Sequence, residues 1–293
     1  MSPELLPRDR RALRVELALL LAVTFGASGL RAILRLVEAL TDPTPLNEQE
    51  ALLNQSQSHL AWLDPAFQLI TSGVLFAWGG LAAFLLLRHL PPQPAPPQPA
   101  LRLRLRAEDW PHGAGLAALI GLPGLAFYAL AVQLGASKVV VPSGLGEHWW
   151  TLPSLLLNAW ANGVAEELIV VAWLATRLRQ LNVRWPGIFA ASALLRASYH
   201  LYQGVSAGLG NAVMGLVFIE YFRRTGRVWP LIIAHGLIDT AAFAGYVLAD
   251  GHLGVMSRDV VESVEGYAAN RRVVSVVVVE VEPAGQRQAS FGL

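Results

Sequence analysis

The chain has 293 residues, and only 15% of them are charged, against about 25% in soluble domains. Its hydrophobic share of 54% and mean hydropathy of +0.45 exclude a soluble enzyme, and the absence of cysteine excludes a disulfide framework, thiol catalysis and cysteine-ligated zinc. A formal net charge of +1 gives no reason to expect nucleic acid as a partner. The composition predicts a polytopic membrane protein embedded in a lipid bilayer.

Seven segments are apolar enough to cross a membrane, which takes about 20 mostly apolar residues. Residues 65–87 and 113–137 contain no charge, and the other five segments carry ionisable residues: 13–30, 152–176, 187–202, 205–222 and 229–248. The first segment follows a cluster of arginines, as a signal peptide does, but the helical pattern continues beyond it without a convincing cleavage site, so we expect a retained helix. The predicted fold class is all-α, a transmembrane bundle of about seven spans.

Basic residues orient these spans, because cytoplasmic loops are enriched in lysine and arginine. If the N-terminus is cytoplasmic and the first helix continues to about residue 40, the outer loops over 41–64 and 138–151 hold only one basic residue, Lys138. The inner segments then hold fourteen arginines, at positions 8, 10, 11, 14, 88, 102, 104, 106, 177, 179, 184, 223, 224 and 227. This bias predicts a multi-pass protein of the cell membrane with a cytoplasmic N-terminus.

A proline-rich stretch divides the chain, since six of the nine residues over 91–99 are proline. We expect a two-helix membrane segment over 1–90, an extended, basic cytoplasmic linker over 91–110 and a core over 111–250. The alternating leucine and arginine of 101–106 suit a strand or a segment on the anionic inner leaflet. No chemistry can be assigned to the polar tail over 251–293.

Six ionisable residues lie inside three of the predicted spans: Glu166, Glu167, Arg196, His200, His235 and Asp239. A charge near the centre of a membrane helix costs about 2.5–3.5 kcal/mol, so such residues face a protein interior or a wet cavity and have partners. They either join helices together or build a functional site. Their number on three helices favours a site.

Helical spacing sorts the polar residues into stripes, because residues four apart share a face. The stripes are Asn158, Asn162 and Glu166; Ser192, Arg196 and His200; and His235 with Asp239. We expect the three stripes to converge on one cavity within the bilayer. Asn211, among glycines of the sixth predicted span, either lines the same cavity or lies where those glycines allow close helix approach.

Two carboxylates and two histidines in a wet cavity are typical of a hydrolase. A glutamate can take a proton from water, a histidine can hold that water, and a second histidine can stabilise an oxyanion. The same residues could bind zinc, although the H-E-x-x-H signal is missing. A proton-coupled transporter is the alternative, because chains of carboxylates and histidines also relay protons.

At these positions the sequence resembles the CAAX prenyl protease and bacteriocin-processing family (CPBP, or Abi) of intramembrane proteases. The family pattern is EExxxR, then FxxxH, then HxxxN or HxxxD. It is matched by Glu166-Glu167, by His200 and by His235 with Asp239, in order and on separate predicted helices. The resemblance covers about residues 150–250, which makes 111–250 a protease-like core.

The resemblance implies an intramembrane endopeptidase of the CAAX metalloprotease type. Glu166 would be the general base, His200 would hold the attacking water, and His235 with Asp239 would stabilise the oxyanion. Glu167 would support them. The resemblance allows either zinc, held by Glu166, His200 and His235, or a metal-independent glutamate, and it implies a membrane protein or lipidated peptide as substrate.

Two positions depart from the family pattern. The arginine of EExxxR falls on Val171, and the phenylalanine of FxxxH falls on Arg196. One exchange explains both: we predict that Arg196 pairs with Glu167 across the helix interface. Arg196, Asn162 and Asn211 are therefore expected to support the site. A catalytically silent scaffold of the same fold is a further alternative.

Overall fold

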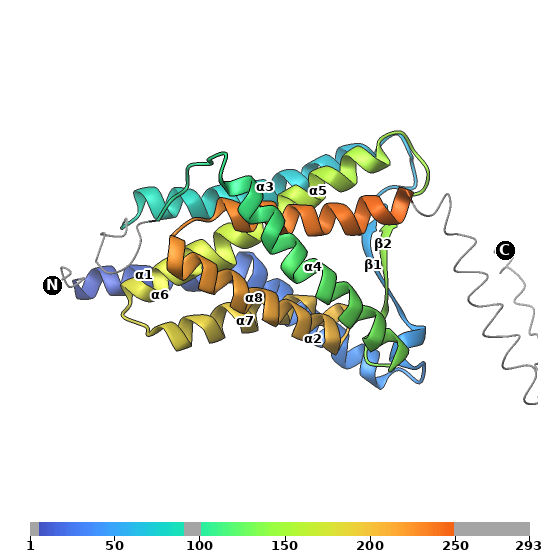
Figure 1. The fold of residues 1–293 in the computed structure, drawn as a ribbon, viewed down its shortest axis with the longest axis horizontal. Helices are drawn as coiled ribbons and strands as arrows, with labels where there is room; N and C mark the ends of the chain where they lie inside the picture. Colours follow the sequence, from blue (N-terminus) through green and yellow to red (C-terminus); the bar gives the residue numbers. More distant parts are fainter. Residues whose placement is uncertain (1–5, 91–100, 249–293) are drawn as a thin grey trace, which may run out of the picture. The chain divides into compact units, whose positions relative to one another are not determined.

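The computed structural model describes residues 6–90 and 101–248, and most of these residues are helical (Figure 1). The predicted polyproline stretch at 91–99 and the tail at 251–293 lie outside the described residues. Within the described part the prediction of an all-α helical bundle is confirmed.

Eleven helical segments and turns follow one another from α1 to α8 in the described residues. They are α1 (Pro7–Val23), α2 (Phe25–Thr41), the 3₁₀ turn η1 (Leu46–Glu48), α3 (Asp64–Arg88), α4 (Asp109–Gln133), α5 (Thr151–Glu166), the π-helical η2 (Glu167–Trp173), α6 (Leu174–Gln180), α7 (Trp185–His200), the 3₁₀ turn η3 (Leu201–Gln203) and α8 (Val205–Thr225). A final helix, which has no label in Figure 1, covers Trp229–Leu248.

Five helices are long and apolar enough to cross a membrane: α3, α4, the continuous Thr151–Gln180 segment, α8 and Trp229–Leu248. The pair α1 and α2 adds a sixth candidate, bent by 47°. At the bend the Thr24 hydroxyl donates to the Leu20 carbonyl at 2.6 Å, a back-bond that bends helices. The chain is therefore a multi-pass membrane protein. The predicted fifth span, 187–202, corresponds to α7 (Trp185–His200), whose 16 residues fall short of the ~20 needed to cross.

A small sheet was not predicted. Strands β1 (Glu50–Gln55) and β2 (Val139–Gly144) pair in parallel, with Glu50 opposite Val139 and Gln55 opposite Gly144. The sheet joins the connection after α2 to the connection after α4. Residues 101–106 do not form a strand: Arg102 makes a single bridge with Arg227, within the described residues.

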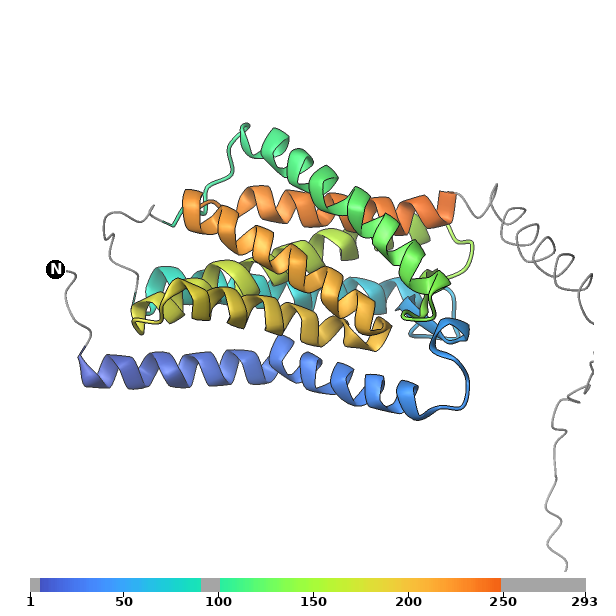
Figure 2. The same ribbon diagram turned by 60° about the horizontal axis from the view of Figure 1, so that its bottom comes forward.

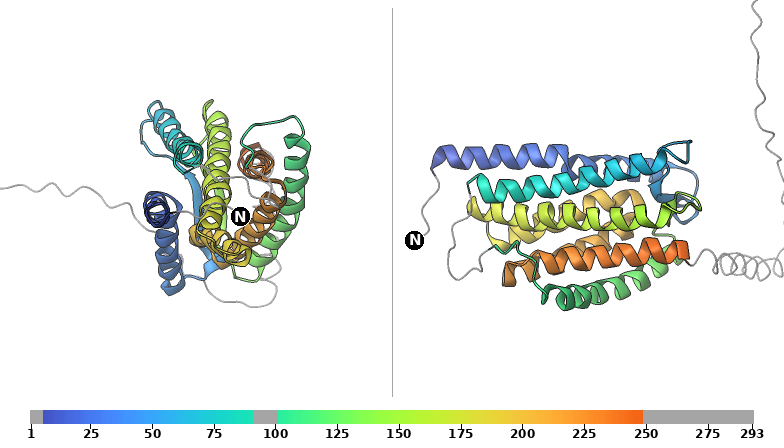
Figure 3. Two further views of the ribbon diagram at one scale, coloured as in Figure 1. Left: turned by 90° about the vertical axis from the view of Figure 1, so that its left-hand side faces the viewer. Right: turned by 90° about the horizontal axis from the view of Figure 1, so that it is seen from above.

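The α5–η2–α6 segment lies at the centre of the bundle, and every residue of η2 is buried. Views from two sides place α1 and α2 along one flank and α4 along the opposite flank (Figures 2 and 3). Small residues let the central segment touch its neighbours. A Cβ on Gly79 of α3 would lie 3.0 Å from the Val164 carbonyl oxygen, and one on Gly163 would lie 3.1 Å from that of Ile232. These contacts bring the final helix against the centre.

Candidate active site

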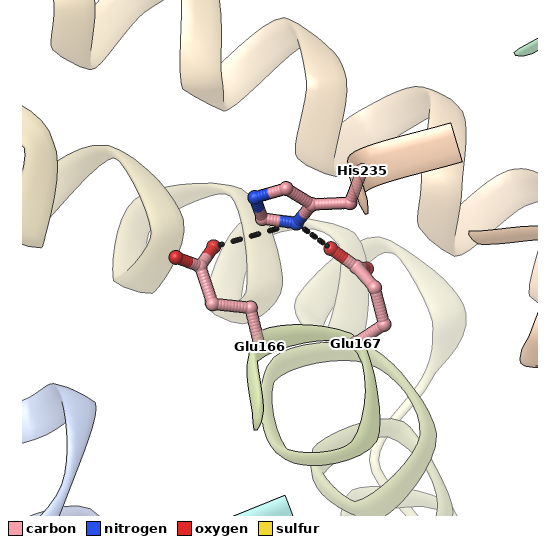
Figure 4. Close-up of side chains that lie close together, drawn as sticks. All are labelled: Glu166, Glu167 and His235. Atoms are coloured by element: carbon pink, nitrogen blue, oxygen red, sulfur yellow. Dashed lines mark hydrogen bonds and ion pairs between the residues drawn. The ribbon is translucent and has the colours of Figure 1, made fainter. Parts of the chain in front are cut away.

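The site begins where α5 changes into the π-helical segment η2, between Glu166 and Glu167. A π-helix closes its hydrogen bonds over five residues and is found mostly at functional sites. From α7, the Ser192 hydroxyl donates to the Val170 carbonyl at 2.9 Å within this segment. Figure 4 shows that the two adjacent glutamates both reach His235. Adjacent residues of a regular α-helix do not face each other.

Glu166 is bound through one oxygen. Its Oε2 accepts a hydrogen bond of 2.6 Å from the Tyr199 hydroxyl and one of 3.1 Å from Nη1 of Arg196. The same oxygen lies 3.9 Å from Nδ1 of His235. Its Oε1 receives no hydrogen bond from any described residue. One face of the carboxylate is therefore occupied by the protein, and the other oxygen is not.

Glu167 is bound through both oxygens. Nη2 of Arg196 donates to Oε1 at 2.7 Å and to Oε2 at 2.8 Å, and Nδ1 of His235 donates to Oε1 at 2.7 Å. The side chains of Glu167 and Arg196 are both 0% exposed, so this is a fully buried ion pair. The predicted pairing of Arg196 with Glu167 is confirmed, and the same guanidinium also reaches Glu166.

The final helix contributes His235 and Asp239, one turn apart. Nε2 of His235 lies 3.5 Å from Oδ2 of Asp239, and the Asp239 side chain is 20% exposed. That distance exceeds the 2.7–3.2 Å of an ordinary N–H···O bond. Glu167 therefore fixes the imidazole through Nδ1, while Nε2 keeps only a loose contact.

His200 is the last residue of α7. Its Nδ1 bonds to the Arg196 carbonyl one turn back at 2.9 Å. No hydrogen bond joins it to another predicted site residue in the described chain. The ring is thus oriented by its own helix, and Nε2 is left for another partner.

The asparagines of the predicted stripes have separate partners. Asn158 binds Asn54 of β1, whose own amide donates to the Pro142 carbonyl at 2.7 Å. Asn211 donates to the Ala207 carbonyl of its own helix at 3.0 Å. No hydrogen bond of Asn162 is found among the described residues. None of the three joins the hydrogen-bonded group around Glu166.

Tyr199 is the site residue that sequence reasoning missed. It follows Arg196 by three residues and therefore shares its helix face, and its hydroxyl makes the shortest contact to Glu166. A tyrosine on an apolar helix is ordinary, so only the spacing to Arg196 could have singled it out.

Residues 148–241 match a family model described as Rce1-like, type II CAAX prenyl endopeptidase. The match spans 94 of the 293 residues and contains every side chain of the group around Glu166. Over these residues the chain is similar to the CAAX prenyl endopeptidase family. No curated protein and no solved structure matches the chain.

Whether residues 148–241 could hold a metal ion depends on the donor atoms that their side chains offer. Glu166, Glu167 and His235 each offer one ligand atom, and these atoms lie within 4.8 Å of one another, so the cluster could hold an ion. This set differs from the predicted one, because Glu167 takes the place of His200, whose Nδ1 is bound to its own helix.

Arg196 argues against an ion in this arrangement. A structural or catalytic zinc takes at least three protein donors. Here both oxygens of Glu167 and one of Glu166 already bind the guanidinium, and Nδ1 of His235 is directed at Glu167. A divalent ion would therefore have to displace the Arg196 guanidinium from these carboxylates before it could bind here.

Proposed function

We propose that this chain is an intramembrane endopeptidase that hydrolyses a peptide bond with a water activated by Glu166. The observation that carries the proposal is the meeting of Glu166, Glu167 and Arg196 with His235 and Asp239 inside a bundle that crosses the membrane. The similarity of residues 148–241 to CAAX prenyl endopeptidases supports the reaction class.

In the proposed reaction the water lies between Oε1 of Glu166 and Nε2 of His200, and each of these atoms accepts a hydrogen bond from it. Since Nδ1 of His200 is directed at the Arg196 carbonyl, its Nε2 carries the lone pair that such a contact needs. The water oxygen attacks the substrate carbonyl carbon as Glu166 takes one proton. Glu166 then returns that proton to the leaving nitrogen as the C–N bond breaks.

His235 stabilises the oxyanion that forms in between. With both ring nitrogens protonated, His235 donates from Nδ1 to Glu167, and its Nε2 N–H, only 3.5 Å from Asp239, is left to face the substrate carbonyl oxygen. A donor placed in advance inside a dry site costs no reorganisation during the reaction. Arg196 contacts both carboxylates, and its charge together with that of the protonated His235 offsets the two negative charges, which would otherwise repel each other in the membrane interior.

A metal-assisted reaction is the second candidate, because three ligand atoms lie within 4.8 Å. Metal analysis of the purified protein and turnover after treatment with a chelator separate the two. We expect turnover to survive the chelator, since Arg196 supplies the positive charge. Loss of turnover, with recovery on adding zinc, would favour the metal.

The proposed substrate is a membrane protein or a lipidated peptide, and the proposed location is the cell membrane with a cytoplasmic N-terminus. The chain has no cysteine, so single cysteines can be introduced without a background. A cysteine at Ser58, between β1 and α3, should react with an impermeant reagent added to intact cells. A cysteine at Arg184, before α7, should react only after lysis, and the opposite pattern would reverse the orientation.

The activity is tested by comparing membrane proteomes of cells that express the wild type or Glu166→Gln. This substitution keeps the side-chain shape and removes the base, and general bases contribute about 10²–10⁴ to rate. We expect at least one membrane protein whose cleavage stops, and Glu38→Gln, an exposed change on α2, should cleave as the wild type does. Identical cleavage by wild type and Glu166→Gln would favour a silent scaffold.

A further inference from the structure

The two oxygens of Glu166 are treated differently by α7. Arg196 and Tyr199, three residues apart and on one face of that helix, both donate to Oε2. Neither donates to Oε1. A carboxylate that is bound on one oxygen by two donors in fixed positions cannot rotate freely about its last bond, so its plane and its unbound oxygen are set together.

The ring of Tyr199 is held by contacts that do not involve Glu166. It packs on Phe25 of α2 with ring centroids 4.7 Å apart, and Phe25 in turn meets Trp78 of α3 edge-on at 5.8 Å. The residue is only 7% exposed. Aromatic pairs of this kind have preferred geometries. The position of the hydroxyl is therefore dictated by α2 and α3 rather than by the carboxylate that it binds.

Arg196 alone would not fix Glu166 in this way. Its guanidinium is shared, since Nη2 serves both oxygens of Glu167 while only Nη1 reaches Glu166, and at 3.1 Å this is the longer of the two bonds to Oε2. The Tyr199 hydroxyl, at 2.6 Å, has no other partner among the described residues. The shorter bond thus comes from the residue that is dedicated to Glu166.

We propose that Tyr199 is a positioning residue that holds Glu166 by Oε2 and reserves Oε1 for the attacking water. This inference rests on the proposed function, because it assigns the work of orienting the base. Correct orientation of a catalytic group contributes substantially to rate, and small misplacements are costly. Tyr199 does not touch the substrate, so its effect falls on turnover and leaves substrate binding unchanged.

The test is Tyr199→Phe in the full-length protein reconstituted in vesicles, assayed on the substrate found with Glu166→Gln. Hydrogen bonds to charged groups are worth about 1.5–3 kcal/mol, so we expect kcat to fall by roughly ten- to a hundredfold with KM unchanged. Phenylalanine keeps the packing on Phe25, and the thermal unfolding midpoint should stay near that of the wild type. Tyr221→Phe on α8, which removes a hydroxyl elsewhere, is the matched control and should retain full kcat.

A structural role is distinguished by combining variants and by infrared spectroscopy. Tyr199→Phe should shift the carboxylate bands in wild-type background, and that shift should vanish when Glu166→Gln is already present. A kcat within twofold of wild type, a change in KM alone, or an infrared shift that persists with Glu166→Gln would overturn the proposal. If Glu166→Gln itself keeps full turnover, the proposed function fails, whereas the infrared result still reports on the Tyr199 contact.

Discussion

Two arginines of the bundle are completely buried, yet their surroundings differ. Arg177 of α6 binds Glu16 of α1 through Nε at 2.7 Å and Nη2 at 3.3 Å. Its remaining donors go to Gln180 and to backbone carbonyls at the end of α3, namely those of Leu85, His89 and Leu90. We call these residues, together with Trp173, the Arg177 cluster. Its arginine satisfies the carbonyls that a helix end leaves unpaired.

Glu16 is equally occupied. Its Oε1 accepts from Arg177 and from the Trp173 indole nitrogen at 2.7 Å, and its Oε2 contacts His89. Both oxygens of the carboxylate and every guanidinium nitrogen therefore have partners. A fully satisfied buried network gives rigidity and a single arrangement. It offers nothing to a substrate.

The group around Glu166, which we call the Arg196 cluster, is incomplete by comparison. Nε of Arg196 is buried without a hydrogen-bond partner in the described chain, and Oε1 of Glu166 is not bound. Buried polar atoms normally find partners, so exceptions point to strain, water or function. Both clusters contain a buried arginine–glutamate ion pair. Only the Arg196 cluster keeps polar atoms without partners in the described chain, and this distinguishes a functional site from a purely structural network.

The largest effect on stability should come from breaking the Arg177 cluster. Arg177→Leu removes the cation that pairs with the Glu16 carboxylate and donates to three backbone carbonyls, and breaking a buried ion pair costs about 3–5 kcal/mol. We expect a strongly lowered thermal midpoint in detergent or failure to accumulate. Arg184→Leu, at an exposed arginine before α7, is the control and should leave the midpoint in place. An unchanged thermal midpoint for Arg177→Leu would show that the Arg177 cluster does not stabilise the fold.

In the Arg196 cluster, the effects of substituting Arg196 and Glu167 on turnover should be energetically coupled. Arg196→Ala and Glu167→Ala should each reduce turnover, and the double variant should be less harmful than the two losses combined, since both remove the same pair. Coupling energies between contacting residues are about 0.5–3 kcal/mol. Rate constants of the four proteins give the coupling directly. Strictly additive losses would mean that Arg196 acts on something other than Glu167.

A smaller effect is expected at Asp239. Its 3.5 Å contact to His235 is loose and partly exposed, and the family pattern accepts asparagine there. Asp239→Asn should lower kcat by about tenfold, as expected for the loss of one charge-assisted contact. This loss is far smaller than the one expected for Glu166→Gln. The comparison is made on the same substrate and vesicles. Equal losses would require Asp239 to act through its charge.

The smallest effect is expected at Asn211, which bonds only to the carbonyl of its own helix. Asn211→Ala should change stability by no more than about 0.5 kcal/mol, the usual range for substitutions away from buried networks. Turnover should be that of the wild type. A marked loss of turnover would bring α8 into the site and widen the Arg196 cluster.

The sequence predicted what depends on local spacing. The length of the apolar runs located the membrane helices, and the two departures from the family pattern led to the pairing of Arg196 with Glu167. Sequence reasoning missed the contacts between residues far apart in the chain and the features that depend on rare backbone geometry. Arg177 counted as one more loop arginine, but its partner Glu16 lies 161 residues away in the chain. The π-helical turn at Glu167 has no local signal, and without it the shared reach of two adjacent glutamates to one histidine could not be foreseen.

The parallel pairing of β1 with β2 has a consequence for how the protein could be divided. The sheet joins residues 50–55 to residues 139–144 at one end of the helices, and the Arg177 cluster joins Glu16 and the end of α3 to α6 elsewhere. The first ninety residues are therefore fastened to the core at two places besides the peptide chain. A gene split between residues 95 and 96 should yield two polypeptides that reassemble when co-expressed and purify together on a tag carried by either one.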